Sequence, residues 1–510
     1  MAEIISDGED RISELPVHII HDILRRINVG IYGAKEEART CVLSKTWNSI
    51  WRTRPNVIIQ SIHRSFYKNL ENFVKFVDDS LRTYAEQKLS IETLCLMHLD
   101  CPQELASHVD RWFNLALKLH VRYLCIDASM FGSTYYSIPD SVYAVNNTLT
   151  VLSLANCNIE IDNSTNKLQR LISTCPLIRD LRLTDCKGFQ NFHVTAGLIN
   201  LERLELIWCR ELIKVKIGAP NLKNFVFVGV PLHKYPKTRE PEPMPCTIDI
   251  LDGKSLKSLS LEATTMTDQE FEYQLSKFSA LKFLKLKGCY VMKNMKIVSE
   301  KLEIFDLSDH RGNLEQVNMV APNLIEFNFS SGKTCMPFST MDPSSLERAN
   351  INFYAKSCDS YDFGDVDTSL YNNLLNFIQK FNYSKGLILV IRCEEEFLIY
   401  EDSREIMIPP AQKLELLVKN PSMRLPSFVN DIMSSRPKIA SVVHGIDCKI
   451  PQVFHESATT YTKKQYGRLK EVTNHKGVVA DENGETSTFC TWLKSTSLIE
   501  RITTFSFKWV

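Results

Sequence analysis

The sequence predicts an α/β solenoid, preceded by a small helical unit and followed by a mixed α/β region. Two observations carry this prediction. An apolar motif recurs from residue 91 onward at spacings of 21 to 34 residues, and the first 60 residues contain three short stretches of helical periodicity. The length of 510 residues exceeds what one compact core usually holds, which favours several domains or a repeat array.

The composition is that of a folded chain without a strong charge field. Apolar residues make up 44% and charged residues 24%, and Lys plus Arg equal Asp plus Glu at 60 each. This balance gives no general attraction for nucleic acid, so no nucleic-acid partner is expected. The start lacks a secretory signal and no apolar run approaches a membrane span, so we expect a soluble intracellular protein, nuclear and/or cytoplasmic, with no membrane partner.

Three short helices are predicted in the first 60 residues. Pro16 suits a first helical position, and apolar residues follow it at helical spacing as far as Ile27. Ser44 can cap a third helix that carries Trp47, Ile50 and Trp51. So small a unit cannot bury all of its apolar surface, so we expect an external partner to cover part of it.

A longer helix is predicted between this unit and the repeats. Its apolar residues share one helical face, which suggests a rigid joint. They are Phe66, Leu70, Phe73, Val74, Val77 and Leu81.

The recurring motif is L-x-x-L-x-L, the pattern of leucine-rich repeats. Its eleven matches begin at Ile91, Val121, Leu149, Ile178, Leu201, Leu222, Leu256, Leu281, Leu302, Leu324 and Leu346. Each match predicts a short strand whose leucines point into the coil, while the flanking residues face outward on the concave side of a horseshoe. A protein target is expected on this face, with a merely solvated sheet face as the open alternative. The candidate target-binding residues are Arg182, Arg203, Glu205, Phe283, Lys285 and Lys287.

Four cysteines occupy one position of the repeat, three residues after the last strand leucine. Repeat proteins place Asn or Cys there to satisfy turn backbone inside the coil, so a metal site is a poor interpretation and no cofactor is expected. These are Cys157, Cys186, Cys209 and Cys289. Five prolines between residues 231 and 245 predict an extruded loop, either a contact loop or a tolerated insertion.

After Ile351 the repeat period is lost. A helix is predicted over residues 368–381 and another near 428–434, with strand-like segments at 386–391, 413–418, 469–472 and within 492–507. These segments are expected to cap the open end of the coil. No phosphate-binding glycine loop, H-E-x-x-H or G-x-S-x-G motif is present, and Cys490 lacks an activating environment, so an enzyme is not expected.

Residues 10–16, Ile23-Leu24 and residues 38–47 with Trp51 resemble a plant F-box, although residues 28–35 form a longer turn than that family usually has. The resemblance implies a non-catalytic substrate-recognition subunit of a Skp-cullin-F-box ubiquitin ligase, bound to a Skp-type adaptor and through it to cullin and a RING subunit. A repeat scaffold or ligand receptor without a degradation role is the alternative. The implied adaptor-binding residues are Leu15, Pro16, Ile20, Ile23, Leu24, Val42, Leu43, Ser44 and Trp47.

The repeats also resemble those of plant F-box proteins, and the end of the chain is loosely similar to their FBD region. The implied domains are an F-box (1–60), a helical bridge (61–90), leucine-rich repeats (91–355) and a repeat-capping, FBD-like region (356–510).

Overall fold

The computed structural model describes two compact units, residues 1–253 and residues 254–510. Within them the described residues are 12, 14–27, 33–60, 70–87, 89–97, 99, 103–128, 135–139, 148–159, 167–194, 198–230, 245–289, 291–309, 314–331, 337–341, 345–353, 387–393, 411–418, 439–445, 469–476 and 500–509.

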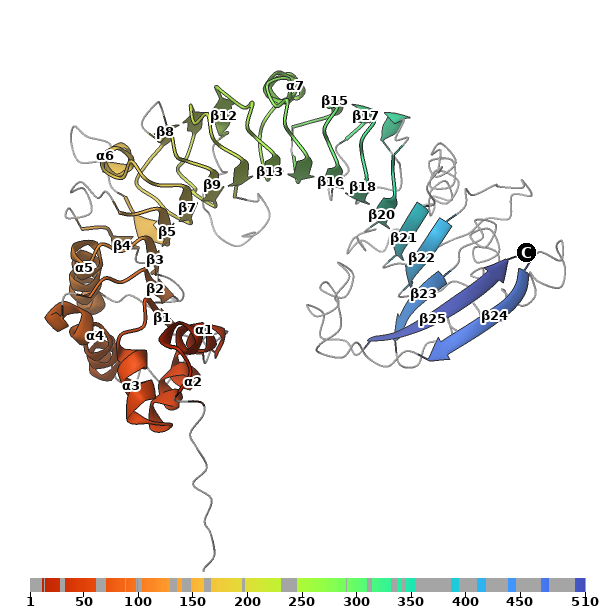
Figure 1. The fold of residues 1–510 in the computed structure, drawn as a ribbon. Coiled ribbons are helices and arrows are strands. Elements are labelled where there is room, and N and C mark those ends of the chain that lie inside the picture. The colour runs from red at the N-terminus through yellow and green to blue at the C-terminus, as the bar shows by residue number, and fades with distance from the viewer. Residues whose placement is uncertain are drawn as a thin grey trace, which may run out of the picture. The chain divides into compact units, whose positions relative to one another are not determined.

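The first unit begins with short helices that pack around a small core (Figure 1). They are α1 (Val17–Ile27), α2 (Gly33–Arg39), the 3-10 helix η1 (Thr40–Val42) and α3 (Lys45–Arg52). The Ser44 hydroxyl caps α3 by accepting a hydrogen bond from the Trp47 amide at 3.1 Å, as the sequence predicts. The core contains Ile20 and Leu24 from α1, packed on Trp47 and Ile50 from α3.

A parallel sheet runs through the rest of the first unit. Its strands pair in sequence order as β1 (Asn56–Gln60), β2 (Thr93–Met97), β3 (Tyr123–Asp127), β5 (Val151–Ala155), β7 (Asp180–Thr184), β9 (Arg203–Ile207) and β11 (Asn224–Val228). The motif leucines align in register across the strands and are buried, as in Leu152, Leu181 and Leu204. The solenoid prediction is therefore confirmed for this unit. The sheet starts one strand earlier than the repeat motif indicates, because β1 pairs with β2 although it lacks the motif.

Helices and short strands complete each coil of the first unit behind this sheet (Figure 1). The helices are α4 (Leu70–Gln87), α5 (Gln103–Lys118) and α6 (Lys167–Thr174). The short strands are β4 (Tyr136–Ser137), β6 (Cys157–Asn158), β8 (Asn191–Val194), β10 (Lys214–Ile217) and β12 (Thr247–Ile250). The predicted helix between the first helices and the repeats is α4, which buries Phe73, Val77 and Leu81 along one face.

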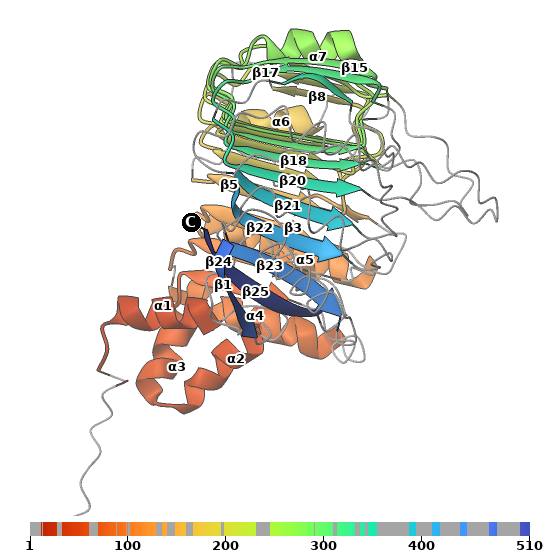
Figure 2. The same cartoon turned by 90° about the vertical axis from the view of Figure 1, so that its right-hand side faces the viewer.

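The second unit has the same coil architecture. Its parallel strands pair in sequence order and stack as successive rungs in Figure 2. They are β13 (Ser258–Glu262), β14 (Phe283–Lys287), β16 (Ile304–Asp309), β18 (Glu326–Ser331), β20 (Arg348–Phe353), β21 (Leu387–Cys393), β22 (Ala411–Val418) and β23 (Ile439–Gly445). Behind them lie α7 (Asp268–Leu275) and the small sheet β15 (Asn294–Val298), β17 (Gln316–Val320) and β19 (Phe338–Met341).

The parallel ladder continues past Ile351, where the sequence period is lost. Strand β20 pairs with β21, and β21 with β22, because ladder pairing needs extended backbone and tolerates long insertions between strands. At the end of the unit, β25 (Glu500–Trp509) runs antiparallel to β23, and β24 (Leu469–Lys476) antiparallel to β25. The expected strands 386–391, 413–418 and 469–472 coincide with β21, β22 and β24. The helices expected at 368–381 and 428–434 lie outside the described residues, as does most of the 231–245 loop.

The turn after several strands repeats one geometry. A residue with left-handed backbone follows the strand, as at Asn156, Asp185 and Trp208, where φ is 58°, 45° and 55°. A cysteine comes next, and its buried thiol donates to strand carbonyls; that of Cys186 lies 3.4 Å from the Leu154 oxygen. The structural role expected for these cysteines is therefore confirmed at Cys157, Cys186 and Cys209, whose thiols make the same kind of contact.

Candidate protein-interaction surfaces

The helical segment, which consists of α1, α2, η1 and α3 with the residues just before α1, leaves large apolar side chains exposed. Val42 and Leu43, at the end of η1, are 86% and 57% exposed. Val42 ends η1, and Leu43 lies directly before Ser44, the residue that caps α3. Both residues therefore lie in the short connection between two helices. Three more apolar side chains of this segment are exposed, namely Ile12, Val17 and Ile19. An exposed group of this kind on so small a unit is typical of a protein-docking surface.

The nine residues expected to bind an adaptor divide into three groups by burial. Ile20, Leu24 and Trp47 are buried inside the helical segment, and Leu15, Ile23 and Ser44 are half-buried. Pro16, Val42 and Leu43 are exposed. The F-box resemblance implies Trp47 as a docking residue, but in the structure its side chain is buried. The helical spacing of Trp47 and Ile50 turns both toward α1, while Trp51 packs at the edge of the same cluster.

Sequence reasoning missed Val17 and Ile19 as exposed apolar residues. A signal for them exists in α1, which carries more apolar residues than one buried face requires. Because Ile20 and Leu24 fill the core, other apolar positions of the same helix must face outward.

A buried arginine joins the helical segment to the first coils. Arg54 forms an ion pair with Glu37 at 3.0 Å, and both side chains are nearly inaccessible to solvent. Its guanidinium donates to the Trp51 carbonyl at 2.7 Å and lies over the Trp51 ring. The Tyr84 hydroxyl of α4 donates to the Arg54 carbonyl, and burial raises the pKa of Tyr84 to about 12. Groups from α2, α3 and α4 thus converge on one residue, which the sequence pattern did not reveal.

The outward charges on β7 and β9 are paired with one another. Arg182 binds the Asp180 carboxylate at 2.6 and 2.9 Å, and this contact raises the pKa of Arg182. Arg203 binds Glu205 at 2.6 and 2.9 Å, and Glu205 also lies 3.8 Å from Arg182. Three residues expected to bind a target therefore lie close together, but their charges are already balanced locally.

The other three expected target residues lie on β14 in the second unit. Phe283, Lys285 and Lys287 are half-buried on its outward side, and Lys287 pairs with Glu262 at 2.6 Å. Lys285 is opposite Asp306 in the β14–β16 ladder. Burial raises the pKa of Asp306, and the charge of Lys285 opposes that effect.

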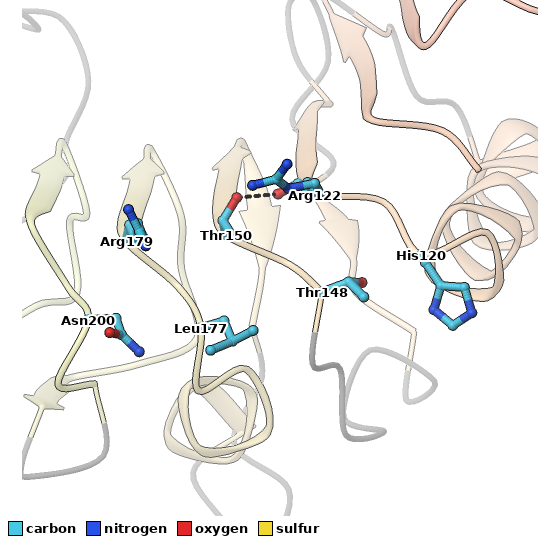
Figure 3. Close-up of a pocket in the computed structure, with 7 residues that line it drawn as sticks. All are labelled: His120, Arg122, Thr148, Thr150, Leu177, Arg179 and Asn200. Atoms are coloured by element: carbon cyan, nitrogen blue, oxygen red, sulfur yellow. Dashed lines mark hydrogen bonds between the residues drawn. The ribbon is translucent and has the colours of Figure 1, made fainter.

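A shallow groove of about 400 Å³ lies at the amino ends of the strands in the first unit (Figure 3). It was not found from the sequence. It is lined by His120, Arg122, Thr148, Thr150, Leu177, Arg179 and Asn200.

No three His, Cys, Asp or Glu side chains within the described residues are grouped so that they could hold a metal ion. Burial raises the pKa of Cys186 and Cys209 well above that of a free thiol, and that of Cys289 to about 12. These thiols are therefore protonated and poor nucleophiles. In the described part of the chain no helix is both long and apolar enough to cross a membrane.

Comparison with known proteins assigns the coils to a family. The family model described as "At1g61320/AtMIF1, LRR domain" matches residues 84–235 and 244–365, together more than half of the 510 residues. The chain belongs to this family of leucine-rich-repeat domains.

Its relatives include plant F-box proteins from Arabidopsis thaliana. F-box/LRR-repeat protein 13 is 22% identical over 231 residues, covering 44% of this chain and 47% of the relative. F-box/FBD/LRR-repeat protein At5g44980 is 25% identical over 227 residues, covering 42% and 48%. F-box/LRR-repeat protein 25 is 26% identical over 226 residues, covering 40% and 78%. The chain spans about half the length of most curated relatives it matches, and the resemblance to plant F-box/leucine-rich-repeat proteins is confirmed.

Proposed function

We propose that this protein is the substrate-recognition subunit of a Skp-cullin-F-box ubiquitin ligase. Residues 1–60 are the F-box that docks on a Skp-type adaptor, and the leucine-rich repeats bind a target protein. The observation that carries the proposal is the adjacent pair Val42 and Leu43, exposed on a segment whose own core is already closed around Trp47. The names of the plant relatives support it.

The docking surface consists of the exposed members of the implied adaptor set, extended by residues of α1. It combines Val42 and Leu43 with the exposed Pro16, Val17 and Ile19. Burying two such side chains fully against a partner stabilises a complex by roughly 3 to 6 kcal/mol before the costs of association. Ile20, Leu24 and Trp47 support this surface from within.

The mechanism is proximity rather than catalysis. The ion pair of Arg54 with Glu37 and the contact with Tyr84 fix the helical segment to α4, so the adaptor and a target on the coils are held at a set separation. Such a tether raises the effective concentration of target lysines at the transfer site. Bond formation to ubiquitin belongs to the partners that the adaptor brings, through cullin and RING subunits.

The C-terminal region closes the coil in this proposal. The antiparallel pair β25 and β24 changes the strand direction after β23 and so ends the parallel ladder. Open repeat arrays require a terminal cap to remain soluble and unpaired, which is the role assigned to residues 356–510.

Affinity purification distinguishes this function from a repeat scaffold or receptor without a degradation role. Tagged full-length protein, expressed in plant cells, is expected to bring down both the adaptor and cullin. Recovery of other partners with neither adaptor nor cullin would favour the scaffold.

A further inference from the structure

The groove of Figure 3 is built from two rows of equivalent repeat positions. One row is the residue directly before the first apolar residue of the motif and contains His120, Thr148, Leu177 and Asn200. The other row is the residue directly after it and contains Arg122, Thr150 and Arg179. Four successive coils therefore contribute to one surface. With neighbouring strands about 4.8 Å apart, the backbones of Arg122 and Arg179 are roughly 10 Å apart, with Thr150 between them.

Both arginines of the groove lack a strong partner. The carboxylate closest to Arg122 is that of Glu92, at 3.9 Å with both side chains more than half exposed, a geometry that contributes little. Arg179 makes no side-chain hydrogen bond or ion pair with the part of the chain that the structure describes. The acid in the next coil, Glu202, is bound by Lys223 at 2.8 Å, which lowers its pKa with a smaller effect from Arg179.

The remaining groups of the groove indicate what could occupy it. The Thr150 hydroxyl donates to the carbonyl of Arg122 at 3.1 Å, so its oxygen is left to accept a hydrogen bond. Leu177, which lines the groove, is 42% exposed, and Ile199, directly before the lining residue Asn200, is 58% exposed. An occupant that suits the whole groove carries an anion, a hydrogen-bond donor and an apolar group.

We propose that this groove binds an extended segment of a partner protein through an acidic side chain, either a carboxylate or a phosphorylated residue. The acidic group lies between Arg122 and Arg179, whose planar guanidinium groups bind such oxygens in pairs. A backbone amide of the segment donates to the Thr150 oxygen, and an apolar side chain covers Leu177 and Ile199. No residue of the helical segment lines the groove, so this binding does not depend on the adaptor interaction.

Three peptide libraries test the proposal with the full-length protein. They share randomised flanks and differ only in the central residue, which is Glu, phosphoserine or Ser, and binding is followed by fluorescence anisotropy. At least one acidic library is expected to bind about tenfold or more tightly than the Ser library, because a charge-assisted pair contributes at least that factor. The preference should weaken as salt concentration rises.

Two variants make the test specific. Replacing Arg122→Ala and Arg179→Ala together should abolish the preference while leaving the thermal melting curve unchanged, because both side chains are exposed. Lys282→Ala is the matched control, since it occupies the same repeat position in the second unit and pairs with Glu303 at 2.5 Å. Equal binding of all three libraries, or an acidic preference that survives in the double variant, would overturn the proposal. Inorganic phosphate binding as tightly as the phosphoserine library would overturn the peptide as occupant.

Discussion

Outward apolar side chains are left exposed on the helical segment, whereas the outward charges on β7 and β9 of the first unit's sheet are paired with one another. In the helical segment, Val42 and Leu43 remain exposed although a closed core lies beneath them. On the sheet, Arg182 and Arg203 point outward, yet each is bound by a carboxylate of its own or the neighbouring strand. An outward position alone therefore does not make a docking residue. What matters is whether the group already has a partner within the chain.

The largest expected effect concerns the core beneath the docking surface. Trp47→Ala should lower the free energy of unfolding of the helical segment by about 4 kcal/mol, because it removes a buried aromatic side chain and leaves a cavity. Urea unfolding followed by circular dichroism measures it. Val42→Ala is the control and should leave the midpoint unchanged, since that side chain is 86% exposed. An equal loss in both variants would contradict the division between core and surface.

The next effect concerns the buried joint. Glu37→Ala should destabilise the first unit by about 3 kcal/mol, because it leaves the Arg54 guanidinium buried without its carboxylate. The adjacent Glu36 pairs with Arg39 on the surface at 2.5 Å and provides a matched control. Glu36→Ala should have little effect. Thermal melting of the two variants distinguishes them, and similar midpoints would show that Arg54 is not a joint.

A smaller effect is a pH dependence with opposite signs in two places. Burial raises the pKa of Asp306, so the folded state loses stability as pH rises from about 4 through that raised pKa. Asp306→Asn should remove this loss of stability because the side chain can no longer ionise. Hydrogen bonds from Arg25 and Arg26 lower the pKa of Asp22. The stability that the ionised Asp22 contributes to the folded state is therefore present above about pH 4 and is lost as pH falls. At pH 7, Asp306→Asn should therefore raise the melting temperature and Asp22→Asn lower it. Melting curves between pH 3 and 7 that shift in the same direction for both variants would rule this out.

The parts predictable from sequence were those set by periodicity. The leucine pattern predicted the buried strand positions and their outward neighbours, since alternation fixes both, and the cysteine spacing predicted the turns. Partner choice was not predictable. Nothing local to Arg54 indicates that Glu37 and Tyr84 reach it, and the pairing of Arg203 with Glu205 depends on side-chain rotamers that a spacing rule does not contain. The groove at Arg122 and Arg179 was not predictable in this way, because its residues precede the strands and strand alternation does not apply to them.

The most direct test of the account is the affinity of the purified chain for a Skp-type adaptor, measured by isothermal calorimetry with wild type and a Val42→Glu, Leu43→Glu double variant. The account predicts binding by wild type and at least about thirtyfold weaker binding by the double variant, since charges replace the central apolar contacts. Val320→Glu, which charges a 58% exposed valine in the second unit, should bind like wild type. Wild-type affinity in the double variant, with its fold intact, would contradict the account.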